Sequence, residues 1–147
     1  MNTEDSNDLQ RLAEGCMQLM RARDHTLTRF GITVDAIGPG TARLSMMFDE
    51  TTANGLGMAH GGFIFLLADC AFAYACNSRN RYAVGQFCNI VYIKAGEKSG
   101  RYTATAEERS LTARSGVYDV TVRDEDLQLI AEFRGHSRIV EGTYFPE

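Results

Sequence analysis

The sequence predicts an α+β fold in which a curved, mostly antiparallel β-sheet wraps around a central α-helix, with an amphipathic helix at the N-terminus. Three observations support this fold class. The segment 63–76 is apolar on every face of a helical wheel except for one charge, Asp69. Strand-like alternation of apolar and polar residues occurs both before and after this segment. A helix that is apolar all round must be covered by protein, and a curled sheet provides such a cover.

The first part of the chain predicts a helix and a β-hairpin. Apolar residues recur at helical spacing over about residues 7–23, which predicts an amphipathic helix. Alternating residues on both sides of Gly38-Pro39-Gly40 predict two strands joined by this turn. Residues 50–59 contain two glycines and little periodicity, so we expect a loop that leads into the central helix.

The second part of the chain predicts the central helix and four strands. The helix covers about residues 61–78, and the polar residues Asn77-Ser78-Arg79-Asn80 mark its end. Clusters of turn residues separate the strand-like segments that follow, 83–94, 101–111, 115–123 and 127–140. At this length and apolar content, we expect a single domain over residues 1–147.

Composition excludes several classes of function. The net charge is −4 and the basic residues are scattered, which argues against nucleic acid or an anionic membrane as a partner. The apolar run 63–76 is shorter than the roughly 20 residues that cross a bilayer, and the acidic start of the chain is unlike a signal peptide, so a cytoplasmic protein is expected. The four cysteines show neither C-x-x-C pairs nor zinc-ligand spacing, which predicts reduced thiols and no metal site.

Asp69 is the leading catalytic candidate. A carboxylate inside an apolar helix has a large desolvation cost unless it is paired, hydrogen-bonded or used in chemistry. We therefore expect its pKa to be raised. The alternative is a buried carboxylate that caps a loop.

A motif surrounds this residue. Asn54 is followed after a short Gly-rich loop by His60-Gly61-Gly62, and Asp69 lies eight residues after Gly61 in the apolar helix. This pattern resembles the signature of hotdog-fold acyl-CoA thioesterases and is closest to their phenylacetate-degradation (PaaI-type) group. Segments downstream, 115–120 and 133–135, resemble the same group, so that the likeness spans about residues 25–142.

The resemblance implies a hotdog fold, hydrolysis of acyl-CoA thioesters without metal or cofactor, and a homodimer or, more usually, a homotetramer. It implies that coenzyme A enters only as part of substrate and product. Carried over by position, the Gly61 N–H would polarise the thioester carbonyl, and Asp69 would attack it or activate water. Asn54 and His60 would orient the site.

Further residues are expected to contact substrate. Gly62 leaves the amide of Gly61 unobstructed, and Lys94 is a candidate for the phosphates of CoA. Family members often place Ser or Thr on the strand after the helix, whereas this chain has Gly85-Gln86-Phe87-Cys88-Asn89 there. Gln86 or Asn89 could replace the missing hydroxyl, and Phe87 could line an acyl pocket.

The spacing of Gly61 and Asp69 has a consequence that is independent of the family. Eight residues on one helix separate them by about 12 Å along the axis. One carbonyl group cannot contact both, so a shared reaction needs the Asp of a second subunit whose helix lies antiparallel. A monomer should then be inactive.

Alternatives remain open from the sequence. His60 could be structural, Gly61-Gly62 could only permit close packing, and Asn54 could be an ordinary turn residue. A non-catalytic acyl-CoA sensor is a second function, although the chain lacks a helix-turn-helix extension. A dehydratase or hydratase of the same fold is a third, but Tyr74 occupies the position where we would expect its histidine. The choice between nucleophile and general base for Asp69 is also open.

Overall fold

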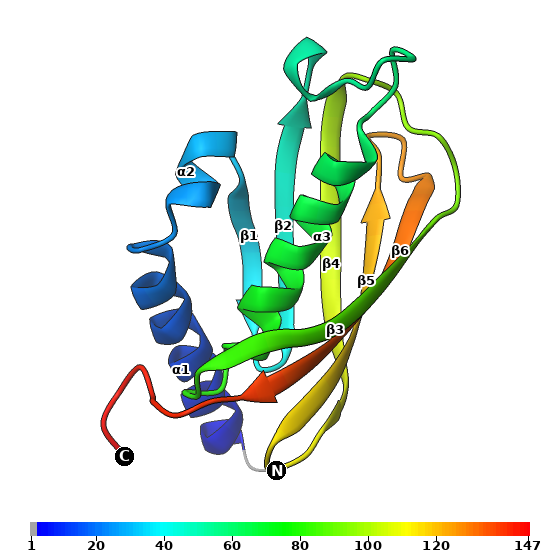
Figure 1. The fold of residues 1–147 in the computed structure, drawn as a ribbon. Helices are drawn as coiled ribbons and strands as arrows, with labels where there is room; N and C mark the ends of the chain where they lie inside the picture. The colour runs from blue at the N-terminus through cyan, green and yellow to red at the C-terminus, as the bar shows by residue number, and fades with distance from the viewer. Residues whose placement is uncertain (1–2) are drawn as a thin grey trace.

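The computed structural model describes residues 3–147, and its strands form one antiparallel sheet in the order β1-β2-β4-β5-β6-β3. Helix α3 lies against one face of this sheet, and α1 lies beside β1 (Figure 1). This arrangement confirms the predicted fold class. In chain order the elements are α1 (Thr3–Arg21), α2 (His25–Phe30), β1 (Thr33–Gly38), β2 (Thr41–Phe48), a 3-10 turn η1 (Glu50–Thr52), α3 (Gly61–Cys76), β3 (Ala83–Tyr92), β4 (Gly100–Leu111), β5 (Ser115–Arg123) and β6 (Leu129–Ile139).

Helix α2 is the element that the sequence did not predict. It has only six residues, which is too short for a periodic apolar pattern. Asp24 begins it, because one carboxylate oxygen accepts hydrogen bonds from the N–H groups of Thr26 and Leu27 at 3.1 and 3.4 Å. Gly31 ends it in the left-handed conformation, with φ 63°.

The predicted boundaries differ from the structure in five elements. Strand β4 begins one residue earlier than predicted, at Gly100, and β6 covers residues 129–139 rather than 127–140. The other three elements are α1, α3 and β3. Helix α1 covers residues 3–21 rather than 7–23. Helix α3 ends at Cys76 rather than at residue 78, because Asn77 takes the C-cap position. Strand β3 ends at Tyr92 rather than at residue 94, because the next two N–H groups both turn to the carbonyl of Ile130.

The sheet side of α3 forms the core. Every second residue is buried in the first half of β4, from Tyr102 to Ala106, and along β5, from Gly116 to Val122, as expected for strands with one covered face. The prediction that the helix is covered on every side is wrong for the single chain. A stripe on its opposite face is half-buried or exposed, because the sheet curls around only one side: Gly62, Phe65, Leu66, Asp69 and Ala73.

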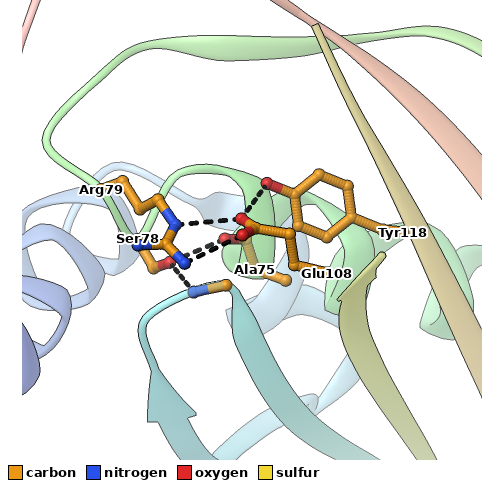
Figure 2. A network of polar contacts seen from close by, with 6 residues as sticks. Ala75, Ser78, Arg79, Glu108 and Tyr118 are labelled. Atoms are coloured by element: carbon orange, nitrogen blue, oxygen red, sulfur yellow. Dashed lines mark hydrogen bonds and ion pairs between the residues drawn. The ribbon is translucent and has the colours of Figure 1, made fainter. Parts of the chain in front are cut away.

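A polar network fixes the C-terminal end of α3 (Figure 2). The hydroxyl of Ser78 donates to the carbonyl of Ala75 at 2.7 Å and accepts from the N–H of Gly40 at 2.8 Å. Arg79 donates two hydrogen bonds to the carboxylate of Glu108, at 3.0 and 2.9 Å, and Tyr118 donates a third at 2.9 Å. The network therefore joins the end of the helix to the β1–β2 turn and to two central strands.

Candidate active site

His60 begins helix α3 and satisfies most of its first N–H groups. Its backbone is extended, with φ −69° and ψ 128°, and its Nδ1 atom accepts the N–H of Gly62 at 2.9 Å. Its carbonyl accepts the N–H groups of Phe63 and Ile64 at 3.0 and 3.2 Å. Because Nδ1 is an acceptor, the ring proton lies on Nε2, and that N–H has no acceptor among residues 3–147.

The N–H of Gly61 is the exception. No acceptor for it occurs among residues 3–147. Such a donor at the positive end of a helix dipole is suited to an anionic or strongly polarised oxygen. Gly62 is exposed, and its own N–H is occupied by His60, so the two glycines have different roles in this turn.

A cavity of about 300 Å³ lies beside Gly61. Asn54, Tyr92 and Lys94 line it together with main chain from the end of β3. The structure thus brings together three of the predicted site residues from separate parts of the chain: Asn54, Gly61 and Lys94. Lys94 also hydrogen-bonds Gln128 through its ammonium group.

Asn54 holds the loop that borders this cavity. Its side-chain oxygen accepts the N–H groups of Leu56 and Met58 at 2.9 and 3.0 Å, which leaves the amide nitrogen available for another partner. An antiparallel bridge between Ala53 and Ala59 closes the same loop. Asn54 is therefore a turn residue that also lines the cavity beside Gly61.

Asp69 lies on the uncovered stripe of α3, one half of the helix away from Gly61. Its carboxylate is half-buried, and it has no hydrogen-bond or ion-pair partner within residues 3–147. Burial raises the pKa of the Asp69 carboxyl above its ordinary value, as expected from the sequence. A carboxylate in this state can act as a base or as a nucleophile, because no Lys or Arg among residues 3–147 forms an ion pair with it.

The remaining predicted residues, Gln86, Phe87 and Asn89, lie on strand β3. Gly85 faces Phe72 on α3, and Cys88 packs against the core on the same side. The bulge at Gln86 breaks the alternation, so that Phe87 and Asn89 point to the outer face of the sheet, away from α3. Gln86 itself is exposed. The structure does not bring these three side chains to Gly61, and their contact with substrate stays a prediction.

Two residues near the site were missed from the sequence. One of them is Cys88 on β3. Burial, and to a lesser extent the negative charge of Asp69, raise the pKa of the Cys88 thiol. Tyr92 donates its hydroxyl to the carbonyl of Gly61 at 2.9 Å. The sequence signal that could have identified both residues is the two-residue repeat of a β-strand, which places Cys88, Ile90 and Tyr92 on the same face of β3.

The described residues contain neither a metal-binding cluster nor a membrane-spanning helix. No group of three or more His, Cys, Asp or Glu side chains within residues 3–147 is arranged to hold a metal ion. In the same part of the chain, no helix has the length and apolar character needed to span a membrane. The four cysteines are free thiols; Cys16, Cys70 and Cys76 are buried, and Cys88 is half-buried.

Comparison with known proteins identifies the family. The family model described as "Thioesterase superfamily" matches residues 56–131. The acyl-coenzyme A thioesterase PaaI of Escherichia coli is 36% identical over 124 residues, which cover 84% of this chain and 89% of that protein.

Solved structures agree with the sequence relatives. The structure of the Escherichia coli PaaI protein, from the phenylacetic acid degradation operon, matches with a TM-score of 0.89 and 35% identity, covering 92% of this chain and 98% of that one. The TT0310 protein from Thermus thermophilus matches with a TM-score of 0.76 and 35% identity, covering 80% of this chain and 99% of that one. The chain has the hotdog fold and belongs to the thioesterase superfamily.

Proposed function

We propose that this protein is an acyl-CoA thioesterase that hydrolyses an aryl-acetyl-CoA, or a related short- to medium-chain acyl-CoA, to the free acid and CoA. The observation that carries the proposal is a pair of unsatisfied groups on one helix, namely the Gly61 N–H and the Asp69 carboxylate, neither of which has a partner within residues 3–147. Likeness to the PaaI thioesterase of Escherichia coli supports the substrate class.

The chemistry follows from these two groups. Attack on a thioester places negative charge on the carbonyl oxygen, and the Gly61 N–H at the helix N-terminus stabilises that charge. Asp69 either attacks the carbonyl carbon to form a mixed anhydride, with CoA leaving as a thiolate, or removes a proton from the attacking water. The free Nε2–H of His60 and the amide nitrogen of Asn54 orient the thioester. No metal or other cofactor is required, because CoA arrives with the substrate.

The two groups belong to different sites. They are separated by about 12 Å along one continuous helix, so each active site combines Gly61 of one subunit with the Asp69 of another. A second copy fits the free side of the molecule, where β3 is an edge strand. Tyr92, which is about half exposed, lies at the end of this strand on the side of α3, where the stripe with Phe65, Leu66 and Asp69 is also incompletely covered. The homodimer is then the smallest active unit, and two dimers form a homotetramer.

The physiological setting is part of the proposal. A relative from a phenylacetic acid degradation operon supports an aromatic acyl group and a role in the breakdown of aromatic acids in the cytoplasm. A panel of acyl-CoA substrates ranks these choices directly. Phenylacetyl-CoA should exceed decanoyl-CoA in kcat/KM.

The test is release of CoA, monitored with a thiol reagent, by wild type and by Asp69→Asn. Wild type should release thiol from phenylacetyl-CoA, and the variant should lose about 10⁴-fold in kcat because the base or nucleophile is gone. Wild type that binds these thioesters without releasing CoA would instead be a sensor. Equal rates for both proteins would reject the role of Asp69. Single-turnover reaction in ¹⁸O water separates the mechanisms, because label enters Asp69 only through the anhydride.

A further inference from the structure

Tyr92 contacts the first residue of helix α3 from the far end of β3. Its hydroxyl donates to the carbonyl oxygen of Gly61 at 2.9 Å. Its ring lies over the same residue, because a Cβ atom added to Gly61 would be 3.2 Å from the ring carbon that bears the hydroxyl. Tyr92 also lines the cavity beside Gly61. The contact is therefore both a hydrogen bond and a wall of the candidate site.

Gly61 needs such a contact. It is the first helical residue, where helices fray, and glycine has more backbone freedom than any other residue. The peptide plane before it is held at the carbonyl of His60, which accepts the N–H groups of Phe63 and Ile64. The peptide plane after it is held at both of its polar groups: Tyr92 donates to the carbonyl of Gly61, and the N–H of Gly62 donates to Nδ1 of His60. Because both peptide planes are fixed, the N–H of Gly61 is held in a single orientation.

The backbone of Tyr92 is itself anchored. Tyr92 pairs with Ala131 of β6, and the next N–H, of Ile93, donates to the carbonyl of Ile130 at 2.8 Å. The Tyr92 side chain therefore fixes the position of the first residue of α3 relative to the sheet. A tyrosine hydroxyl is protonated at neutral pH, and burial raises the pKa of Tyr92 further above its ordinary value.

We infer that Tyr92 is a positioning residue for thioester hydrolysis: its hydroxyl and ring hold Gly61 so that the free N–H points at the position where the oxyanion forms. The inference rests on the proposed function. A preorganised donor stabilises the transition state more than the bound substrate. Loss of the contact between Tyr92 and Gly61 should therefore lower kcat and leave KM unchanged.

The test compares two tyrosines that donate to opposite ends of α3. Tyr92→Phe removes the bond to Gly61, and Tyr144→Phe removes a bond of 2.7 Å to Asn77, the C-cap of the same helix. Tyr92→Phe should lower kcat about tenfold with KM within about twofold of wild type. The effect is smaller than for deletion of the Gly61 N–H, because the N–H is still present but is less well oriented. Tyr144→Phe should leave kcat unchanged, whatever its effect on Tm.

Further measurements exclude a merely structural role. Tyr92 is half-exposed, so Tyr92→Phe should fold with the Tm and the oligomeric state of wild type. Tyr92→Leu, which also removes the ring, should lower kcat further than Tyr92→Phe. If Tyr92→Phe retains full kcat while Asp69→Asn is inactive, the inference is overturned and the proposed function stands. If Asp69→Asn is as active as wild type, the proposed function fails whatever Tyr92 does.

Discussion

The two ends of helix α3 satisfy their polar groups in opposite ways. At the C-terminal end, Glu108 accepts from both Arg79 and Tyr118, and Asn77 bonds to main chain and to Tyr144. At the N-terminal end, the Gly61 N–H has no acceptor among residues 3–147, and Gly61 lines a cavity of about 300 Å³. Backbone donors are rarely left unpaired unless water or a ligand can reach them. The comparison indicates that the C-terminal end stabilises the fold, and it supports the proposal that the N-terminal end takes part in catalysis.

The two ends are held by separate contacts. Charge-assisted bonds from Arg79 to Glu108 stabilise the packing of the C-terminal end on the sheet, whereas Tyr92 contacts Gly61 locally at the other end. Changes at the N-terminal end should therefore affect catalysis with little effect on stability. Changes at the C-terminal end should do the reverse.

Among variants at the two ends of α3, the largest effect is expected from removing the unpaired N–H of Gly61. Gly61→Pro deletes the N–H, and proline suits the first position of a helix. The extended backbone of His60, with ψ 128°, is also compatible with a following proline. We expect kcat for phenylacetyl-CoA to fall about 10²–10³-fold, as for the loss of one oxyanion donor.

Gly61→Ala is the matched control. Both variants add a Cβ atom 3.2 Å from the ring of Tyr92, but alanine keeps the N–H. Gly61→Ala should therefore retain much more activity than Gly61→Pro. Equal losses in the two variants would mean that crowding, and not the donor, accounts for the effect.

A smaller effect is expected at the other end of the helix. Arg79→Ala leaves the carboxylate of Glu108, which is 17% exposed, without its cation. The free energy of unfolding should fall by about 2 kcal/mol, less than for a fully buried pair because Arg79 is one-third exposed. Urea unfolding at fixed protein concentration measures this loss, and kcat per folded molecule should stay near that of wild type.

Arg81→Ala provides the comparison for this variant. Arg81 lies two residues away and contacts Glu147 at 3.7 Å, with both side chains more than half exposed. Its removal should cost less than about 0.5 kcal/mol. An Arg79→Ala protein as stable as Arg81→Ala would show that the network is not what fixes this end.

Much of this division could be predicted from the sequence. The apolar run identified α3, its single charge identified Asp69, and strict alternation gave β5 as residues 115–123. Helix α2 escaped because a six-residue helix capped by one aspartate has no period to detect. The contact from Tyr92 to Gly61 escaped because it joins residues 31 positions apart. The bulge at Gln86 determines which side of the sheet each later residue of β3 faces. It could not be predicted, because the apolar and polar residues before Gln86 do not indicate where the alternation shifts.

The smallest expected effect concerns Asp69, between the two ends. Its pKa is raised in the folded state by burial, so its charge destabilises the fold once pH rises from the unfolded-state pKa through the folded-state pKa. Asp69→Asn should therefore have a slightly higher Tm than wild type at pH 7, and the difference should vanish in acid. A lower Tm at pH 7 would mean that the ionised carboxylate has a stabilising partner.

The most direct test of a site shared between subunits is mixing of two inactive variants. Asp69→Asn and Gly61→Pro chains are co-refolded in equal amounts, and thiol release is measured. If each site combines Gly61 of one subunit with Asp69 of its partner, half of the dimers are mixed and each has one intact site, so about one quarter of wild-type activity should return. Mixtures that stay as inactive as the separate variants, with mixed dimers demonstrated by mass spectrometry, would contradict the shared site.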